Sequence, residues 1–207
     1  MTIVDKQPPW QVLLIGGNSG VGKTIIAKRV AQHFGLSWLQ VDDFRLTLQR
    51  VTTPEQQPAL HSFVVDEQIW HLSPEMLCKH LIEVGRVVSH ALEIVIANHV
   101  ATKAPIVLEG DGILPEVAAQ HTFANLDAGN QVRSVFLFEA DKDIIFKSML
   151  ERGRSFERLS AAEQQTQVQT SWLYGQWLRE EAQRYGLSAL EARPWTTLAE
   201  RVITVIK

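Results

Sequence analysis

The residues whose types and spacing best suit a chemical task form a glycine-rich run after an apolar segment. The run matches the pattern G-x-x-x-x-G-K-[ST] and comprises Gly17, Asn18, Ser19, Gly20, Val21, Gly22, Lys23 and Thr24. The apolar residues 12–15 precede it, and apolar residues at helical spacing follow it. A strand, a glycine loop and a helix in this order are the setting in which such a pattern binds phosphate groups.

Each residue type in the run has a physical role in holding phosphate. Glycines permit positive φ angles and lack a Cβ atom, so successive backbone N–H groups can surround phosphate oxygens. The positive end of the following helix points at the same oxygens. Lys23 adds a charge at the β- and γ-phosphates, and the Thr24 hydroxyl suits Mg²⁺. The run therefore predicts a site for a nucleoside triphosphate such as ATP, together with Mg²⁺.

Two neighbouring carboxylates, Asp42 and Asp43, follow the apolar stretch 36–41, which we expect to be a strand. Ligands of open α/β sheets gather at the carboxyl ends of the strands, so an acid there should face the same cleft as the glycine loop. Because side chains alternate along an extended segment, only one of the two should face an acceptor beside the terminal phosphate. The other carboxylate and the nearby Arg45 are candidate substrate contacts.

A second group of acids follows the apolar residues 105–108. A buried strand that ends in a carboxylate places an acid beside Mg²⁺ and its waters, next to the loop hydroxyl. Glu109 is the first candidate for this metal-side acid. Asp111 is a candidate substrate contact instead.

Three arginines lie within residues 151–158 around a glycine. The planar guanidinium group suits phosphate oxygens, and a transferring phosphoryl group needs such donors when the site closes. We therefore expect a lid at about residues 152–160, which contains Arg152 and Arg154. Residues 45–72 lack a clear pattern, and so long a connection favours an acceptor-side binding segment, with Arg50 and His61 as further candidate contacts.

The order of the apolar stretches predicts an α/β fold with a five-stranded parallel sheet and helices on both faces. Strands are expected at residues 12–15, 36–41, 105–112, 132–138 and 187–190. Helices are expected at residues 22–35, 73–101, 115–126, 141–150 and 160–185, with another at the end of the chain. Since no repeat, linker or low-complexity tract is evident, residues 1–207 should form a single domain.

The amino-acid composition limits the kinds of molecule that this protein is expected to bind. The chain has 207 residues, of which 45% are hydrophobic and 21% charged, as in ordinary globular proteins. Its net charge of −3 gives no basic footprint for nucleic acid. The first nine residues lack the features of a signal peptide, and no uninterrupted apolar stretch reaches transmembrane length. We therefore expect a cytoplasmic protein without nucleic-acid or membrane partners, and a homodimer stays open.

These motifs together resemble the small-molecule kinases of the P-loop superfamily. The similarity is greatest to the uridine kinase and nicotinamide riboside kinase type, and to proteins labelled 2-phosphoglycerate kinase or chloramphenicol phosphotransferase. The motifs concerned are the P-loop, Asp-Asp-Phe after the second strand, Glu-Gly after the third, and an Arg-x-Arg lid. Residues 61–102 and the run Glu-Gly-Asp-Gly depart from those families, so the identity of the substrate does not carry over.

The resemblance implies specific roles for residues of this chain. Asp42 would be the catalytic base, and Glu109 would lie near Mg²⁺. Arg152 and Arg154 would be the lid arginines, and residues 193–197, which begin with Arg193, would form the loop beside adenine.

The sequence thus predicts an ATP- and Mg²⁺-dependent kinase that phosphorylates a hydroxyl group of a small molecule. A nucleotide kinase remains an alternative, for which Arg45 and Arg50 would have to bind the acceptor phosphate. A toxin-like kinase for sugar nucleotides and a non-catalytic ATP-binding module also stay open. A GTPase is disfavoured because the sequence contains no [NT]-K-x-D motif.

Overall fold

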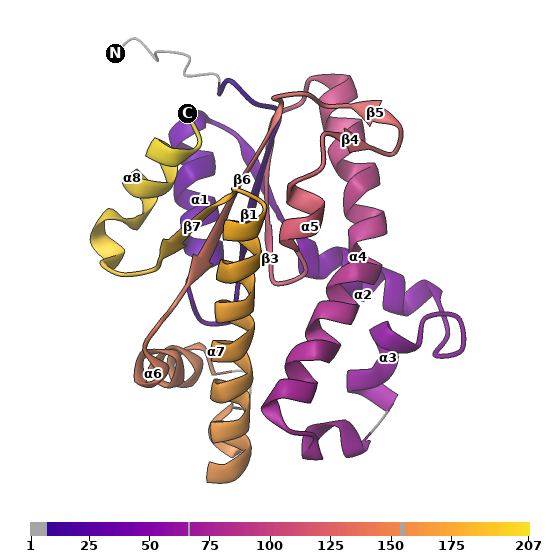
Figure 1. Ribbon diagram of the computed structural model, residues 1–207, viewed down its shortest axis with the longest axis vertical. Coiled ribbons are helices and arrows are strands. Elements are labelled where there is room, and N and C mark those ends of the chain that lie inside the picture. Colours follow the sequence, from indigo (N-terminus) through magenta and orange to yellow (C-terminus); the bar gives the residue numbers. More distant parts are fainter. Residues whose placement is uncertain (1–7, 66, 154–155) are drawn as a thin grey trace.

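The computed structural model describes residues 8–65, 67–153 and 156–207. Within these ranges, five parallel strands form a sheet with the order β2-β3-β1-β6-β7. The strands are β1 (Val12–Gly17), β2 (Ser37–Gln40), β3 (Ile106–Gly110), β6 (Val132–Phe138) and β7 (Ser188–Glu191). Helices pack on both faces of the sheet (Figure 1). The predicted α/β fold with a five-stranded parallel sheet is confirmed.

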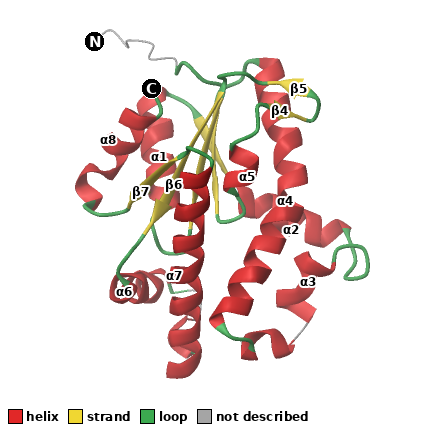
Figure 2. Ribbon diagram, in the orientation of Figure 1, coloured by secondary structure: helices red, strands yellow, loops and turns green. Residues whose placement is uncertain are grey.

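The two faces of the sheet bury separate hydrophobic cores because side chains alternate along each strand. On β1, Val12 and Leu14 face the core beneath α4 and α7, whereas Leu13 and Ile15 face the core beneath α1 and α8. The helices that cover the sheet are α1 (Lys23–Phe34), α4 (Pro74–Thr102), α5 (Pro115–Ala118), α7 (Ala161–Arg184) and α8 (Trp195–Val205) (Figure 2). Burial on both faces explains why the central strands are apolar runs. In the described part of the chain, no helix is both long and apolar enough to cross a membrane.

The segment after β2 is more regular than the sequence predicts. The helix α2 (Val41–Val51) begins directly after Gln40, and α3 (Pro58–Val65) and the short 3₁₀ helix η1 (Glu67–His71) follow. The predicted strand through residue 41 and the loose segment after it are therefore wrong. Val41 continues the apolar run, but its buried side chain belongs to the first turn of α2. The acids at positions 42 and 43 favour this helix start through the helix dipole.

Further boundaries differ from the predictions, and the strand expected at residues 105–112 ends at Gly110. The expected helix at 115–126 ends at Ala118, and a hairpin of β4 (Thr122–Phe123) and β5 (Leu126–Asp127) follows, because Ala124 and Asn125 adopt positive φ angles in its turn. The helix α6 (Lys142–Arg152) continues two residues beyond the predicted end at 150, and η2 (Phe156–Arg158) follows it.

The topology brings the ends of three strands together. In register, Gly16 of β1 pairs with Gly110 of β3, and Gln40 of β2 pairs with Glu109. The glycine loop, the start of α2 and the end of β3 therefore meet at one edge of the sheet. The strands that follow β1 in the chain lie on both sides of it, β2 and β3 on one side and β6 on the other. Open α/β sheets form a ligand crevice at such a point, where the strand order reverses direction.

Candidate active site

The glycine loop between β1 and α1 has the conformation that its sequence predicts. Gly20 and Gly22 have φ angles of 86° and 80°, which other residue types rarely adopt. A Cβ atom added to Gly22 would lie 1.8 Å from Cη2 of Trp195, so this position also requires glycine for lack of space. The loop backbone is thereby in direct contact with the start of α8.

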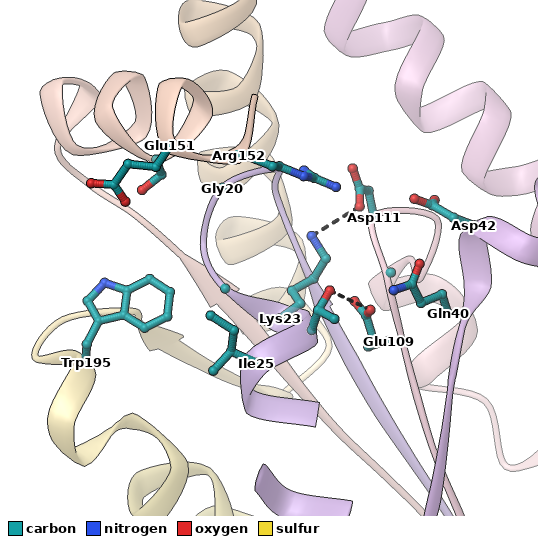
Figure 3. Close-up of a pocket in the computed structure, with 14 residues that line it drawn as sticks. Gly20, Lys23, Ile25, Gln40, Asp42, Glu109, Asp111, Glu151, Arg152 and Trp195 are labelled. Atoms are coloured by element: carbon teal, nitrogen blue, oxygen red, sulfur yellow. Dashed lines mark hydrogen bonds and ion pairs between the residues drawn. The ribbon is translucent and has the colours of Figure 1, made fainter. Parts of the chain in front are cut away.

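Lys23 lies at the centre of the site and is only 7% exposed. Its Nζ donates a hydrogen bond to the carbonyl oxygen of Asn18 at 2.9 Å and lies 3.1 Å from Oδ1 of Asp111 (Figure 3). Burial would raise the pKa of Asp111, but the charge and hydrogen bond of Lys23, with help from Arg152, hold it below the ordinary value. The ammonium group is therefore fixed between the glycine loop and the end of β3.

Thr24 and Glu109 form a second contact between α1 and β3. The Thr24 hydroxyl donates to Oε1 of Glu109 at 2.8 Å, and the carboxylate is 3% exposed (Figure 3). Burial raises the pKa of Glu109, although the Thr24 hydrogen bond and Lys23 oppose the shift.

The oxygen atoms of this pair fit Mg²⁺. Mg²⁺ prefers oxygen ligands and is usually bound by one or two carboxylates together with substrate phosphates. Among the residues that the structure describes, no cluster of three or more His, Cys, Asp or Glu side chains forms a complete metal cage. The Thr24 hydroxyl and the Glu109 carboxylate could together supply two of the oxygen ligands of such an ion beside the glycine loop.

Asp42 lies in the first turn of α2 and faces the site, whereas the side chain of Asp43 is exposed. The prediction that the two acids alternate as on a strand was wrong, because successive helical residues are rotated by roughly 100° instead. Burial and the charge of Asp111 raise the pKa of Asp42, against the opposing effects of Arg45, Lys23 and Arg152. Arg45 is near this carboxylate, with Nε 4.0 Å from Oδ1.

Two cavities meet at Asp42. The first, of about 430 Å³, extends from the glycine loop to Ile25 and Trp195. The second, of about 440 Å³, lies between α7 and the α3–α4 region. Asp42, Asp111 and Arg152 line both cavities. A group bound in one cavity can therefore contact a molecule in the other at these three side chains.

The predicted arginines fall in different places. Arg152 is the last residue of α6, and its Nη1 donates to the Ser19 hydroxyl at 2.9 Å. Arg154 lies outside the described residues. Arg193 lines neither cavity; its Nε is 3.3 Å from Oε2 of Glu139, and its guanidinium lies 5.2 Å from the ring centre of Trp195.

The candidate substrate contacts from residues 45–72 also lie in different parts of the structure. Arg45 lines the second cavity, whereas Arg50 is exposed and lines neither. His61 is buried, and its Nε2 lies 3.2 Å from the Thr52 hydroxyl oxygen. His61 therefore links α3 to the end of α2 and lines neither cavity.

Sequence reasoning missed the contribution of α7. Asn18 donates to the Ser171 hydroxyl at 3.1 Å, and this hydroxyl donates to the carbonyl oxygen of Ser19 at 3.0 Å. The Tyr174 hydroxyl donates to the backbone carbonyl of Asp111. A Cβ atom on Gly175 would lie 2.6 Å from Oδ1 of Asn18. The helix thus supports both the glycine loop and the end of β3, and no local pattern in its sequence signals this.

No sequence-family model matches the chain, and no curated protein matches it. Solved structures do match. A shikimate kinase from Acinetobacter baumannii in complex with shikimate has a TM-score of 0.52 and 15% identity, over 98% of this chain and 94% of that one. A sugar kinase from a Janibacter species has a TM-score of 0.52 and 21% identity, over 96% and 95%. A deoxyadenosine kinase from M. mycoides has a TM-score of 0.50 and 14% identity, over 93% and 97%.

These comparisons establish the fold. Each alignment extends over nearly the whole of both chains, so this chain shares its overall α/β fold with these solved structures. At these identities the similarity carries no information about substrate. The finer resemblance to uridine kinase and nicotinamide riboside kinase stays a prediction.

Proposed function

We propose that this chain, which has the P-loop kinase fold, is an ATP- and Mg²⁺-dependent kinase that phosphorylates a hydroxyl group of a small molecule. The observation that carries the proposal is the position of Asp42. This carboxylate lies where the cavity at the glycine loop meets a second cavity of similar size. A phosphoryl donor in the first and an acceptor in the second would meet beside a base.

The first cavity suits the nucleotide. Loop N–H groups, the start of α1 and Lys23 supply donors for the phosphates. Ile25 and Trp195 lie at the end of this cavity away from Asp42, where the base of the nucleotide would extend (Figure 3). Mg²⁺, for which Thr24 and Glu109 are the candidate ligands, neutralises phosphate charge when bound.

The residues around Asp42 suit a direct in-line transfer. The Asp42 carboxylate would accept the proton of the acceptor hydroxyl while the oxygen of that hydroxyl forms a bond to the γ-phosphorus. The bond between the γ-phosphorus and the β–γ bridging oxygen would break at the same time. Lys23 and Arg152 would stabilise charge on the transferring group and on the leaving ADP. Catalysis would then consist mainly of positioning and electrostatic stabilisation. The raised pKa of Asp42 strengthens it as a base.

A hydroxyl acceptor is better supported than a nucleotide acceptor. A nucleotide kinase needs cations for the acceptor phosphate, and the sequence offers Arg45 and Arg50 for this role. Arg45 lies beside the Asp42 carboxylate, and Arg50 does not line the second cavity. Turnover of ATP with and without acceptors would also distinguish a kinase from a non-catalytic ATP-binding module or a toxin-like sugar-nucleotide kinase.

The proposal predicts that ATP with Mg²⁺ stabilises the protein through Lys23. A ligand at about 100 times its dissociation constant adds about 2.7 kcal/mol of stability. For a chain of this size, that corresponds to a rise in Tm of roughly 5–10 °C. We expect Lys23→Ala to abolish most of this rise, because the charge directed at the β- and γ-phosphates is lost.

Thermal melting with and without ATP and Mg²⁺ tests this prediction. Lys28→Ala is the matched control, because Lys28 lies on the same helix, is exposed and does not line the first cavity. If Lys23→Ala keeps the full ATP-dependent shift, the glycine loop is not the nucleotide site.

A further inference from the structure

Two successive carbonyl groups of the glycine loop are held by hydrogen bonds. The carbonyl oxygen of Asn18 accepts from Nζ of Lys23 at 2.9 Å. The carbonyl oxygen of Ser19 accepts from the Ser171 hydroxyl at 3.0 Å and from Nδ2 of Asn18 at 3.3 Å. A carbonyl oxygen has two lone pairs, so both are used at Ser19. The Ser19 carbonyl is therefore fixed in direction, towards α7.

The direction of this carbonyl also fixes the next N–H group of the loop. The Ser19–Gly20 peptide bond is trans, and in a planar trans peptide the C=O and N–H bonds point to opposite sides. The N–H of Gly20 therefore points away from α7, and Gly20 lines the first cavity (Figure 3). In this orientation the N–H group can bond to the phosphates of a nucleotide in that cavity.

The glycine itself does not select this orientation. Gly20 has a φ angle of 86°, and glycine adopts positive and negative φ angles about equally. A half-turn of the Ser19–Gly20 peptide plane would exchange the two groups and direct the carbonyl oxygen at the phosphates, whose charge repels it. A contact from outside the loop is needed to hold the peptide in the orientation that binds anions.

The Ser171 hydroxyl is directed at the loop and not at its own helix. Serine hydroxyls in helices commonly donate to the carbonyl group four residues earlier. Ser89 of α4 does so, to Gly85 at 2.8 Å. Ser171 bonds instead to Ser19, which lies 152 positions earlier in the chain. Nδ2 of Asn18 donates to the Ser171 oxygen at 3.1 Å, so the hydroxyl proton is left for the Ser19 carbonyl.

A glycine in α7 makes room for this contact. The Asn18 side chain is fully buried, and a Cβ atom on Gly175 would lie 2.6 Å from its Oδ1 atom. Glycine inside a helix is destabilising relative to alanine. The close approach of Asn18 to α7 therefore explains a residue that the helix itself disfavours.

We propose, on the basis of the kinase function proposed above, that Ser171 is a positioning residue for phosphate binding. Its hydroxyl selects the orientation of the Ser19–Gly20 peptide in which the N–H group faces the phosphates. Ser171 acts through the backbone of the loop. Because it also lines the second cavity, the same hydroxyl lies between the acceptor side and the glycine loop.

Ser171→Ala tests this role with two probes, ADP with Mg²⁺ and inorganic tripolyphosphate with Mg²⁺. We expect the dissociation constant of each, measured by calorimetry, to rise at least about tenfold, the effect of losing one hydrogen bond to a charged group. A rise by the same factor for both probes places the effect at the phosphates and not at the base.

Ser89→Ala is the matched control for this measurement. Ser89 and Ser171 are each 5% exposed, but the Ser89 hydroxyl bonds within α4 and Ser89 lines neither cavity. The control should bind both probes as the wild type does. If Ser171→Ala binds both probes as tightly as Ser89→Ala, the inference is overturned.

The amide proton of Gly20 reports the orientation of the peptide directly. In nuclear magnetic resonance spectra of the wild type, its resonance should move downfield when ADP and Mg²⁺ are added, because the proton bonds to phosphate. In Ser171→Ala at saturating ADP this movement should be much smaller. A movement equal to that of the wild type would overturn the inference, since the N–H group would then face the phosphates without the hydroxyl.

The two proposals fail differently in these experiments. A wild-type protein that binds neither probe contradicts the kinase function and this inference with it. Equal binding by the wild type and Ser171→Ala leaves the kinase function intact and rejects only the positioning role of Ser171.

Discussion

Asp42→Asn is expected to lower kcat by roughly 10²–10⁴-fold, the usual contribution of a general base, while ATP still stabilises the protein. The substitution keeps the side-chain volume and removes the group that accepts the proton. Asp42 lines both cavities, so its loss affects the step in which donor and acceptor meet. The measurement is the rate of phosphoryl transfer at saturating ATP and acceptor, together with the thermal shift by ATP.

Asp43→Asn is the matched control for this prediction. Asp43 is adjacent in sequence and in the same helical turn, but it is exposed and lines neither cavity. Near-normal turnover is expected from it. If Asp43→Asn is inactive and Asp42→Asn retains its rate, the two roles must be exchanged.

The pH dependence gives a second test of the same carboxylate. Because burial and Asp111 raise the pKa of Asp42 above the usual 3.8, activity should fall as the pH drops through this raised value. Asp111→Asn removes a negative charge, which lowers the pKa of Asp42 and moves the acid limb of kcat/KM to lower pH. A limb that stays in place or moves to higher pH would assign it to another group.

Arg152→Ala is expected to lower kcat by roughly 10²–10³-fold and to change KM for ATP far less. In this structure Nη1 of Arg152 donates a hydrogen bond to the Ser19 hydroxyl in the glycine loop, and the Arg152 side chain lines both cavities. From this position the guanidinium can bond to the oxygens of a phosphoryl group in transit, an interaction that belongs to the transition state.

Steady-state kinetics separates this role from simple nucleotide binding. Arg158→Ala serves as control, since Arg158 is exposed and lines neither cavity. A rise in the KM for ATP with unchanged kcat would make Arg152 a ground-state ligand of the nucleotide. A circular dichroism spectrum identical to that of the wild type confirms that the fold is intact.

The parts of the site that were predicted from sequence are those that local chemistry constrains. For the proposed nucleotide site, the residues of the glycine loop have to stand in one order, because backbone N–H groups, a lysine and a hydroxyl would all meet the same phosphates. Glu109 follows a buried apolar run, and the parallel register with β1 then places it beside Thr24. The central strands β1, β3 and β6 could be located because each contains a short run of buried apolar residues.

The missed parts depend on contacts between distant residues. The sequence predicted no helix directly after β2, because Val41 extends the apolar run of β2 although its buried side chain belongs to the first turn of α2. Trp195 lines the first cavity because it lies against Gly22, a residue 173 positions earlier in the sequence. Tyr174 of α7 is buried in the core, and its hydroxyl also bonds to the end of β3, a contact between residues far apart in the sequence.

The part of α4 that lines the second cavity, with Leu77, Leu81, Val84 and Val88, shows the same limit. The periodic leucines and valines of α4 predict a helix that packs on a core, and α4 does so. Which of those side chains also border a cavity depends on where α3 and η1 lie, and the sequence of residues 45–72 gave no element there. Exposure of Trp70 beside Phe63 becomes visible only in the folded chain.

The most direct test of the central claim follows the phosphate. The wild-type protein is incubated with Mg²⁺, ATP that carries a labelled γ-phosphate, and a panel of small-molecule alcohols, and the labelled products are separated. The account predicts label in a phosphate ester of one small alcohol, none with Lys23→Ala, and far less with Asp42→Asn. Label found only in inorganic phosphate or in another nucleotide, or left entirely in ATP, would contradict a kinase that acts on a small-molecule hydroxyl.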